Sequence, residues 1–197
     1  MIKLIIFDIG GVLIDFGEDM YTTYISKKLH IDKKEFSRAV MHYLPYMELG
    51  DGSIGAVLKK LAEEFGTSAH SLEWAKAFNM LAKPNKDVIA IANKLSRSYN
   101  VVLLTNVSLS RYRAMRRMLN GIANERIFPS CYLHMRKPSK RIYLYVLRAM
   151  HAKPNNAIFI DNLAENVAGA RKAGIDALRF TTYTKLVVDL KKRRVVV

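Results

Sequence analysis

The sequence predicts an α/β fold in which a parallel sheet core carries an inserted small α-helical cap domain. Two observations lead to this fold class. From residue 84 onward, short apolar segments alternate with segments of helical periodicity, and such alternation produces parallel strands joined by helical crossovers. Between the first and second apolar segments lie roughly 80 residues of helical pattern without a strand, far more than an ordinary crossover needs.

The strands are predicted first, because each is a nearly continuous apolar run. Such runs are typical of strands buried on both faces of a parallel sheet. The first three end directly at polar residues, and the fourth follows Gly174. The predicted strands are residues 2–7, 100–104, 156–160 and 177–180.

The helices are predicted from apolar residues at helical spacing. Those assigned to the core are residues 87–98, 108–119, 140–150 and 162–173. Those assigned to the insertion are residues 20–29, 33–43, 53–65 and 71–78, punctuated by Gly50-Asp51-Gly52 and by Gly66. Because Lys83-Pro84-Asn85 marks the return to the core, we expect a core domain of residues 1–15 and 84–197 and a cap domain of residues 16–83.

The composition excludes several classes of protein. The chain has 197 residues, of which 50% are hydrophobic and 25% charged, as in an ordinary globular protein and unlike a disordered or fibrous one. The single cysteine, Cys131, cannot form an internal disulfide, so we expect a packed thiol in a reducing cytoplasm. No apolar run approaches the ~18 residues of a membrane helix, so no membrane association is expected.

The charge is unusually positive. Lysine and arginine number 32 against 17 acids, a net charge of +15, which attracts anions such as phosphorylated metabolites, nucleic acid or membrane surfaces. For each single cluster we favour solvated helix faces and a frayed basic tail over a nucleic-acid footprint. The clusters are residues 111–117, 136–141 and 191–194.

Polar residues follow the predicted strands at the point where each strand ends. Asp8 follows the first, Thr105-Asn106 the second and Asp161-Asn162 the third. Because the carboxyl ends of parallel strands meet at one edge of a sheet, these side chains should converge there. Lys137 precedes the helix that leads into the third strand, so it can reach the same edge.

This set of residues suits phosphoryl transfer. Asp8 can attack phosphorus as a nucleophile and form an aspartyl-phosphate. A Mg²⁺ ion between Asp8 and Asp161 would neutralise charge on the nucleophile and the phosphate. Lys137 supplies a positive charge for the phosphate oxygens, and the Thr105 hydroxyl donates to the transition state.

The same residues carry a family resemblance. Residues 7–13, 104–106, 135–143 and 159–167 resemble, in order, the four motifs of the haloacid dehalogenase-like hydrolase superfamily, which has a Rossmann-like core and often a helical cap. The resemblance runs from residue 2 to about residue 180. It is greatest to sugar-phosphate phosphatases of the α-D-glucose-1-phosphate phosphatase type.

The resemblance implies a role for each matched residue. Asp8 matches the nucleophile, Lys137 the lysine of the third motif, and Thr105 with Asn106 the phosphate-binding segment. Mg²⁺ would be held by Asp8, the Gly10 carbonyl, Asp161 and Asn162. Two positions depart from the family pattern. Gly10 stands where many members have a second aspartate that transfers protons, and Asn162 replaces the second metal-binding acid.

Two functions are therefore considered. The first is a Mg²⁺-dependent phosphatase, monomeric or homodimeric, that hydrolyses a small phosphorylated metabolite such as a sugar phosphate through an aspartyl-phosphate. The second is a catalytically weak relative whose basic surface binds nucleic acid or another anionic partner, as Gly10, Asn162 and the charge of +15 suggest. In the cap, the candidates for lining the entrance and selecting the substrate are Tyr43, Tyr46, Met47 and Glu48, but for each aromatic residue taken singly we favour packing in the core.

Overall fold

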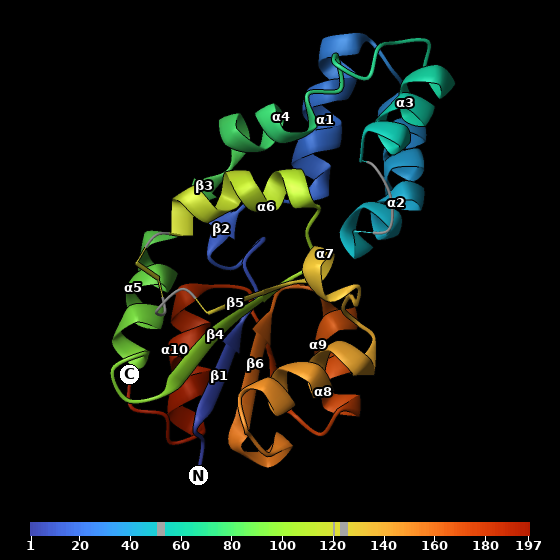
Figure 1. The fold of residues 1–197 in the computed structure, drawn as a ribbon. Coiled ribbons are helices and arrows are strands. Elements are labelled where there is room, and N and C mark those ends of the chain that lie inside the picture. Colours follow the sequence, from blue (N-terminus) through green and yellow to red (C-terminus); the bar gives the residue numbers. More distant parts are fainter. Residues whose placement is uncertain (51–53, 120, 123–125) are drawn as a thin grey trace.

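The protein is built around a five-stranded parallel sheet. The computed structural model describes residues 1–50, 54–119, 121–122 and 126–197. The strand order is β5-β4-β1-β6-β7, so β1 lies in the centre between β4 and β6 (Figure 1). The strands are β1 (Leu4–Phe7), β4 (Asn100–Thr105), β5 (Ile127–Pro129), β6 (Ala157–Asp161) and β7 (Asp176–Arg179).

Helices cover both faces of this sheet. Alternate residues of the central strands face opposite sides, so Ile5 and Phe7 belong to one buried cluster, and Leu4 and Ile6 to the other. The first cluster includes side chains of α5 (Lys86–Leu95) and α10 (Tyr183–Lys192), and the second includes side chains of α8 (Lys140–Ala149) and α9 (Ala164–Lys172). The predicted α/β fold is confirmed.

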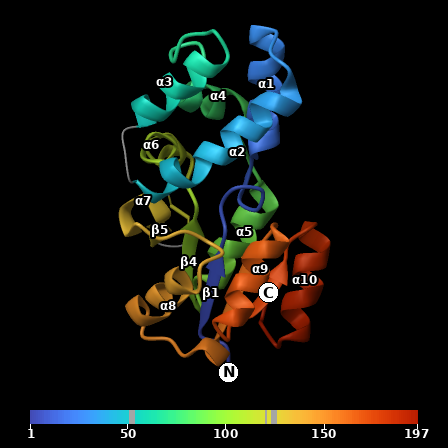
Figure 2. The same ribbon diagram turned by 90° about the vertical axis from the view of Figure 1, so that its right-hand side faces the viewer.

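Among the described residues, four helices lie between Asp15 and Lys83. They are α1 (Glu18–Leu29), α2 (Lys33–Leu49), α3 (Ile54–Glu64) and α4 (Trp74–Leu81). The chain leaves and re-enters the core through two short antiparallel strands, β2 (Ile14–Asp15) and β3 (Lys83–Pro84). In both views the four helices lie beyond the carboxyl edge of the sheet (Figures 1 and 2). The assignment of residues 16–83 to a separate cap domain stays a prediction.

The second of these helices is longer than the sequence suggests. Instead of ending at Tyr43, α2 continues through Pro45 to Leu49. Burial of Leu44 and Met47 in the core stabilises the added turns despite the proline, and Gly50 ends the helix with a φ of 72°. The expected break at Asp51-Gly52 and the start of the next helix at Ser53 fall outside the described residues. Helix α4 begins three residues later than predicted, at Trp74.

The remaining differences concern short or polar elements. Strands β2, β3 and β5 and the short helix α7 (Ser130–Leu133) were not predicted, because none exceeds four residues; α10 was also not predicted, although Leu186 and Leu190 are buried at helical spacing. The segment predicted as one helix over 108–119 is α6 (Leu109–Arg116) followed by the 3₁₀ turn η1 (Arg117–Leu119). A second such turn, η3 (Pro154–Asn156), leads into β6.

The prediction of a frayed basic tail is wrong. Lys191 and Lys192 form the last turn of α10, and Nε of Arg193 lies 2.6 Å from Oδ2 of Asp176. Val195 is buried in the core beyond it. Contacts on both sides of the basic cluster therefore hold the chain in place. No helix among the described residues has the length and apolar character needed to cross a membrane.

Candidate active site

The predicted site residues converge at the carboxyl edge of the sheet. Asp8 follows β1, Thr105 is the last residue of β4, and Asp161 is the last residue of β6. Because β1 pairs with both β4 and β6, these three positions are neighbours. The Asp8 amide donates a hydrogen bond of 2.8 Å to the Ile160 carbonyl, which extends the β1–β6 ladder into the site.

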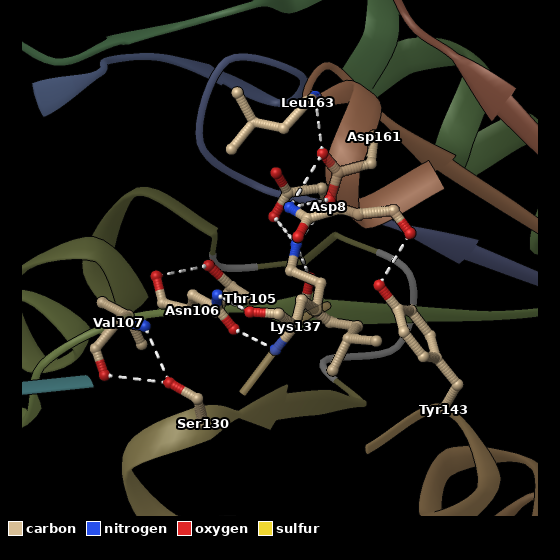
Figure 3. Close-up of polar contacts among 11 residues, drawn as sticks. Asp8, Thr105, Asn106, Val107, Ser130, Lys137, Tyr143, Asp161 and Leu163 are labelled. Carbon is tan, nitrogen blue, oxygen red and sulfur yellow. Dashed lines mark hydrogen bonds and ion pairs between the residues drawn. The ribbon is translucent and has the colours of Figure 1, made fainter. Parts of the chain in front are cut away.

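Lys137 connects the two carboxylates. Its Nζ lies 2.7 Å from Oδ1 of Asp8 and 2.7 Å from Oδ2 of Asp161 (Figure 3). It also donates to the Leu104 carbonyl at 3.1 Å. The side chain is 1% exposed, so the ammonium is held by these three oxygens rather than by water. The structure thus brings together residues 129 positions apart in the chain, as the sequence predicted.

Asn106 holds the backbone of Lys137 in place. Its Nδ2 donates to the Lys137 carbonyl at 2.9 Å, and its Oδ1 accepts from the Lys137 amide at 2.8 Å. Both polar ends of the Asn106 side chain are therefore bonded to the main chain, a role that the sequence did not suggest. Thr105 is 3% exposed, and its hydroxyl makes a long contact of 3.5 Å with the Asn106 carbonyl. Phosphate binding by Thr105 and Asn106 stays a prediction.

Asp161 is fixed by residues of its own loop and helix. Its Oδ1 accepts from the Leu163 amide at 2.8 Å, and Asn166 donates from Nδ2 to both carboxylate oxygens at 3.2 and 3.0 Å. The Tyr143 hydroxyl on α8 donates to the Asn166 carbonyl at 2.8 Å (Figure 3). Asn166 therefore acts as a hydrogen-bonding residue of α9 that orients Asp161. Tyr143 was not singled out, because nothing in its spacing distinguishes it from a core aromatic residue.

The site carries more negative than positive charge. Burial, and after it the neighbouring Asp161, raise the pKa of Asp8 to about 7 against the opposing effect of Lys137. Burial lowers the pKa of Lys137, but the two carboxylates outweigh burial and the net shift is upward. Lys137 is thus a permanent cation between two acids, and a second cation would balance the remaining charge.

The loop after Asp8 is shaped by two glycines. Gly10 forms an isolated β-bridge with Ile14, and it has no side chain that could transfer a proton. Gly11 has a φ of 74°, and a Cβ atom there would lie 2.3 Å from Nδ2 of Asn162. A side chain at position 11 would therefore displace Asn162 as well as strain the backbone.

Asn162 offers an unused acceptor at the same edge. Its Oδ1 is buried and has no hydrogen-bond partner, and an orphaned buried acceptor of this kind calls for a bound ligand or ion. Two carboxylates, one amide oxygen and backbone carbonyls are all hard oxygen donors, which suit Mg²⁺. Within the described residues no group of three or more His, Cys, Asp and Glu side chains could hold a metal. Mg²⁺ fits such a donor set, because it commonly binds one or two carboxylates and keeps waters and substrate phosphate.

Two further ion pairs, missed by the sequence analysis, join the inserted helices to the core. Nη2 of Arg136, one residue before Lys137, lies 2.8 Å from Oε2 of Glu48 at the end of α2. Nη1 of Arg111 on α6 lies 2.7 Å from Oε2 of Glu18 at the start of α1. Their partners are 88 and 93 residues apart, so no local pattern reveals them. We refer to these four residues as the junction pairs.

The predicted entrance residues divide between two environments. Met47 and Glu48 are buried, Tyr43 is half-buried, and Tyr46 is 54% exposed. Packing in the core, which we favour for the aromatic residues, is wrong for Tyr46, whereas Tyr43 packs against the core. The Cys131 thiol is buried, as predicted.

Comparisons with known proteins agree with this architecture. A model of the haloacid dehalogenase-like hydrolases matches residues 2–174. The D-ribitol-5-phosphate phosphatase of Bacteroides thetaiotaomicron is 24% identical over 193 residues, which cover 91% of this chain and 92% of that protein. The sesquiterpene phosphatase astK of Aspergillus oryzae is 25% identical over 198 residues, covering 96% and 95%. The chain is also 25% identical to the drimenol cyclase drtB of Aspergillus calidoustus, but it spans only 34% of that protein's length.

A solved structure shows the same fold. The wild-type HAD family enzyme of Bacteroides thetaiotaomicron, crystallised with magnesium and inorganic phosphate, superimposes with a TM-score of 0.76 at 21% identity, over 92% of this chain and 95% of that one. Similarity to the glucose-1-phosphate phosphatase type in particular stays a prediction. Since the family model covers most of the chain, this protein belongs to the haloacid dehalogenase-like hydrolases and is itself a hydrolase.

Proposed function

We propose that this hydrolase is a Mg²⁺-dependent phosphatase acting on a small phosphorylated metabolite such as a sugar phosphate. One observation carries the proposal: the Lys137 ammonium lies 2.7 Å from the carboxylates of both Asp8 and Asp161 at the carboxyl edge of the sheet. Two phosphatases among the relatives, each aligned over more than nine-tenths of the chain, support phosphate esters as the substrate class.

Asp8 is the proposed nucleophile. A carboxylate oxygen of Asp8 attacks phosphorus, the bond to the leaving oxygen breaks, and an aspartyl-phosphate forms. Water then attacks this phosphorus and releases inorganic phosphate, which restores the carboxylate. Lys137 orients Asp8 and neutralises charge on the phosphate oxygens, while the Thr105 hydroxyl donates a hydrogen bond to them.

The metal would be held by Asp8, Asp161, the Gly10 carbonyl and the amide oxygen of Asn162. When bound, Mg²⁺ neutralises part of the charge on the nucleophile and the phosphate, so that two anions can approach each other. The unpartnered Oδ1 of Asn162 supports its inclusion in this set.

Gly10 limits the choice of substrate. A positioned general acid contributes roughly 10²–10⁴-fold to such reactions, and Gly10 cannot provide one. We therefore expect faster turnover of esters whose alcohol leaves readily, such as a sugar C1-phosphate or p-nitrophenyl phosphate, than of simple alkyl phosphates. The single buried cysteine is consistent with a reducing cytoplasm as the site of action.

The test is a substrate screen with two matched variants. We expect Mg²⁺-dependent hydrolysis of p-nitrophenyl phosphate or a sugar phosphate, and a loss of roughly 10⁴-fold or more in Asp8→Asn, since the nucleophile is removed. Asp15→Asn is the control, because Asp15 lies in the same segment but is exposed. Equal activity in the Asp8 variant and the wild type would refute the mechanism.

A further inference from the structure

A second concave surface lies at the amino edge of the sheet, opposite the site. A hollow of about 1070 Å³ is lined by residues 1–3, 96–100, 193, 194 and 196. Four of its lining side chains are basic, namely those of Lys3, Arg97, Arg193 and Arg194, and none is acidic. Both ends of the chain lie at this edge, away from α1–α4 (Figure 1). Strand β4 separates the edges by six residues, or roughly 20 Å at ~3.3 Å each.

A smaller hollow continues this surface. It has a volume of about 200 Å³, shares Lys3 and Asn100 with the first, and adds His151 and Lys153 to the lining, again without an acidic side chain. We call the two together the amino-edge groove. Because the hollows adjoin, positive charge extends along the starts of β4, β1 and β6 rather than being concentrated at one point.

Most of this charge is not neutralised within the protein. Arg193 is paired with Asp176 at 2.6 and 3.0 Å. In contrast, Lys3, Arg97, Lys153 and Arg194 are exposed, and among the described residues none of them forms an ion pair with an acidic side chain. Clustered like charges of this kind raise the local potential and favour the binding of an extended anion.

Arg194 occupies an unfavourable backbone conformation. Its φ is 59°, at the end of α10, where glycine is the preferred residue. The Val195 amide donates to the Leu190 carbonyl at 3.1 Å and the Val195 side chain is buried, so the turn is fixed. The chain thus keeps an arginine at a position that disfavours it, and this arginine lines the groove.

We propose that the amino-edge groove binds the phosphate backbone of a single-stranded nucleic acid. Its exposed cations provide several phosphate contacts, and Ser96, Ser98 and Asn100 add hydrogen-bonding groups beside them. A concave groove of this size accommodates one backbone rather than a duplex. Among the described lining residues Tyr99 is the only Phe, Tyr or Trp, so binding depends on the backbone and shows little sequence preference.

The test measures the fluorescence anisotropy of a labelled, mixed-sequence single-stranded RNA of 20 nucleotides with the full chain. We expect Arg97→Ala/Lys153→Ala/Arg194→Gly to bind at least ~10-fold more weakly. Since each lost contact to a single strand reduces the slope of log K against log salt by ~0.7, three lost contacts should reduce it by about 2. The control, Lys34→Ala/Arg38→Ala/Lys60→Ala, removes the same charge from exposed positions on α2 and α3 and should change affinity less than ~2-fold.

Several outcomes would overturn the proposal. These are unchanged RNA affinity in the groove variant, an equal loss in the control variant, or equally tight binding of duplex RNA or a polyglutamate peptide. Thermal melts verify folding, and Arg194→Gly itself should not lower the melting temperature, because glycine adopts this φ without strain. Asp8→Asn should bind RNA like the wild type, and the groove variant should hydrolyse p-nitrophenyl phosphate at the wild-type rate. The two proposals can therefore fail separately.

Discussion

Two groups of ion pairs, the candidate site and the junction pairs, differ in their balance of positive and negative charge. At the candidate site, Asp8 and Asp161 share one cation, Lys137, which is 1% exposed. At the junction pairs each acid has its own arginine, at 2.7 Å for Glu18 and 2.8 Å for Glu48. Each junction pair joins one cation to one anion, and Glu18 and Arg136 remain 26% and 28% exposed, whereas the site has two buried acids for one cation.

The surroundings of the two groups reinforce this difference. The Arg111 guanidinium lies 3.4 Å from the ring centre of Trp74 and about 5 Å from those of Phe16 and Tyr21, so aromatic rings enclose it. At Arg111 the unpartnered buried groups are donors, Nε and Nη2, whereas at the edge of the site the amide oxygen of Asn162 is an unpartnered acceptor. The same type of interaction thus stabilises a contact between helices in one place and prepares a site for a cation and a phosphate in the other.

The largest effect is expected from removing the shared cation. Lys137→Met leaves two buried carboxylates without their shared cation, and breaking a buried ion pair costs about 3–5 kcal/mol in the free energy of unfolding. Urea unfolding at pH 8 without metal measures this loss. The loss of stability should be smaller at pH 5, where protonation of the carboxylates relieves their repulsion. It should also be smaller in the presence of Mg²⁺, which replaces the missing positive charge.

Lys140→Met is the matched control, since Lys140 is exposed on α8 and its loss should change stability by less than ~0.5 kcal/mol. A Lys137 variant as stable as this control would show that the excess charge at the site is not real.

The junction pair of Glu48 and Arg136 should make the free energy of unfolding depend on pH. Burial raises the pKa of Glu48 to about 7, against the opposing effect of Arg136, whereas its ordinary value is 4.5. The folded state therefore binds a proton more tightly than the unfolded state, so this stability is present below pH 4.5 and is lost as pH rises to about 7. Glu48→Gln should reduce the loss between pH 5 and pH 8 by on the order of 2–3 kcal/mol, as measured by urea unfolding at each pH.

Part of the loss should remain in this variant, because the pKa of Asp8 is also raised to about 7. Glu64→Gln, at an exposed position on α3, should leave the pH dependence unchanged. Identical pH profiles for the Glu48 and Glu64 variants would contradict the assignment.

The two groups also differ in how far the sequence predicts them. The strands that hold the site are continuous apolar runs, and polar residues such as Asp8 and Asp161 stand where those runs end, so parallel-sheet geometry alone predicts their meeting. The junction pairs depend on how helices pack across about 90 residues of chain, and no periodicity encodes that contact.

Hydrogen bonds from a side chain to the backbone are equally hard to predict from the sequence. Phosphate binding by Asn106 stays a prediction, and the sequence does not reveal that both its polar ends hold the main chain of Lys137. Strand β5 has three residues and ends in Pro129, so it is too short for a period to emerge. Helix α2 passes Pro45 because tertiary burial of Leu44 and Met47 outweighs the local preference.

The smallest effect is expected from adding a negative charge to the site rather than removing its cation. Asn162→Asp adds a carboxylate of nearly the same shape beside Asp8 and Asp161, where two acids already share one cation. Without metal this should lower stability, and with metal the added negative charge should tighten Mg²⁺ binding about tenfold, or ~1.4 kcal/mol. Calorimetric titration of Mg²⁺ measures the change. Asn93→Asp, on α5 away from the site, is the control and should leave Mg²⁺ affinity unaltered. If Asn162→Asp weakens Mg²⁺ binding, the amide oxygen does not face the metal, and the unpartnered acceptor must serve another ligand.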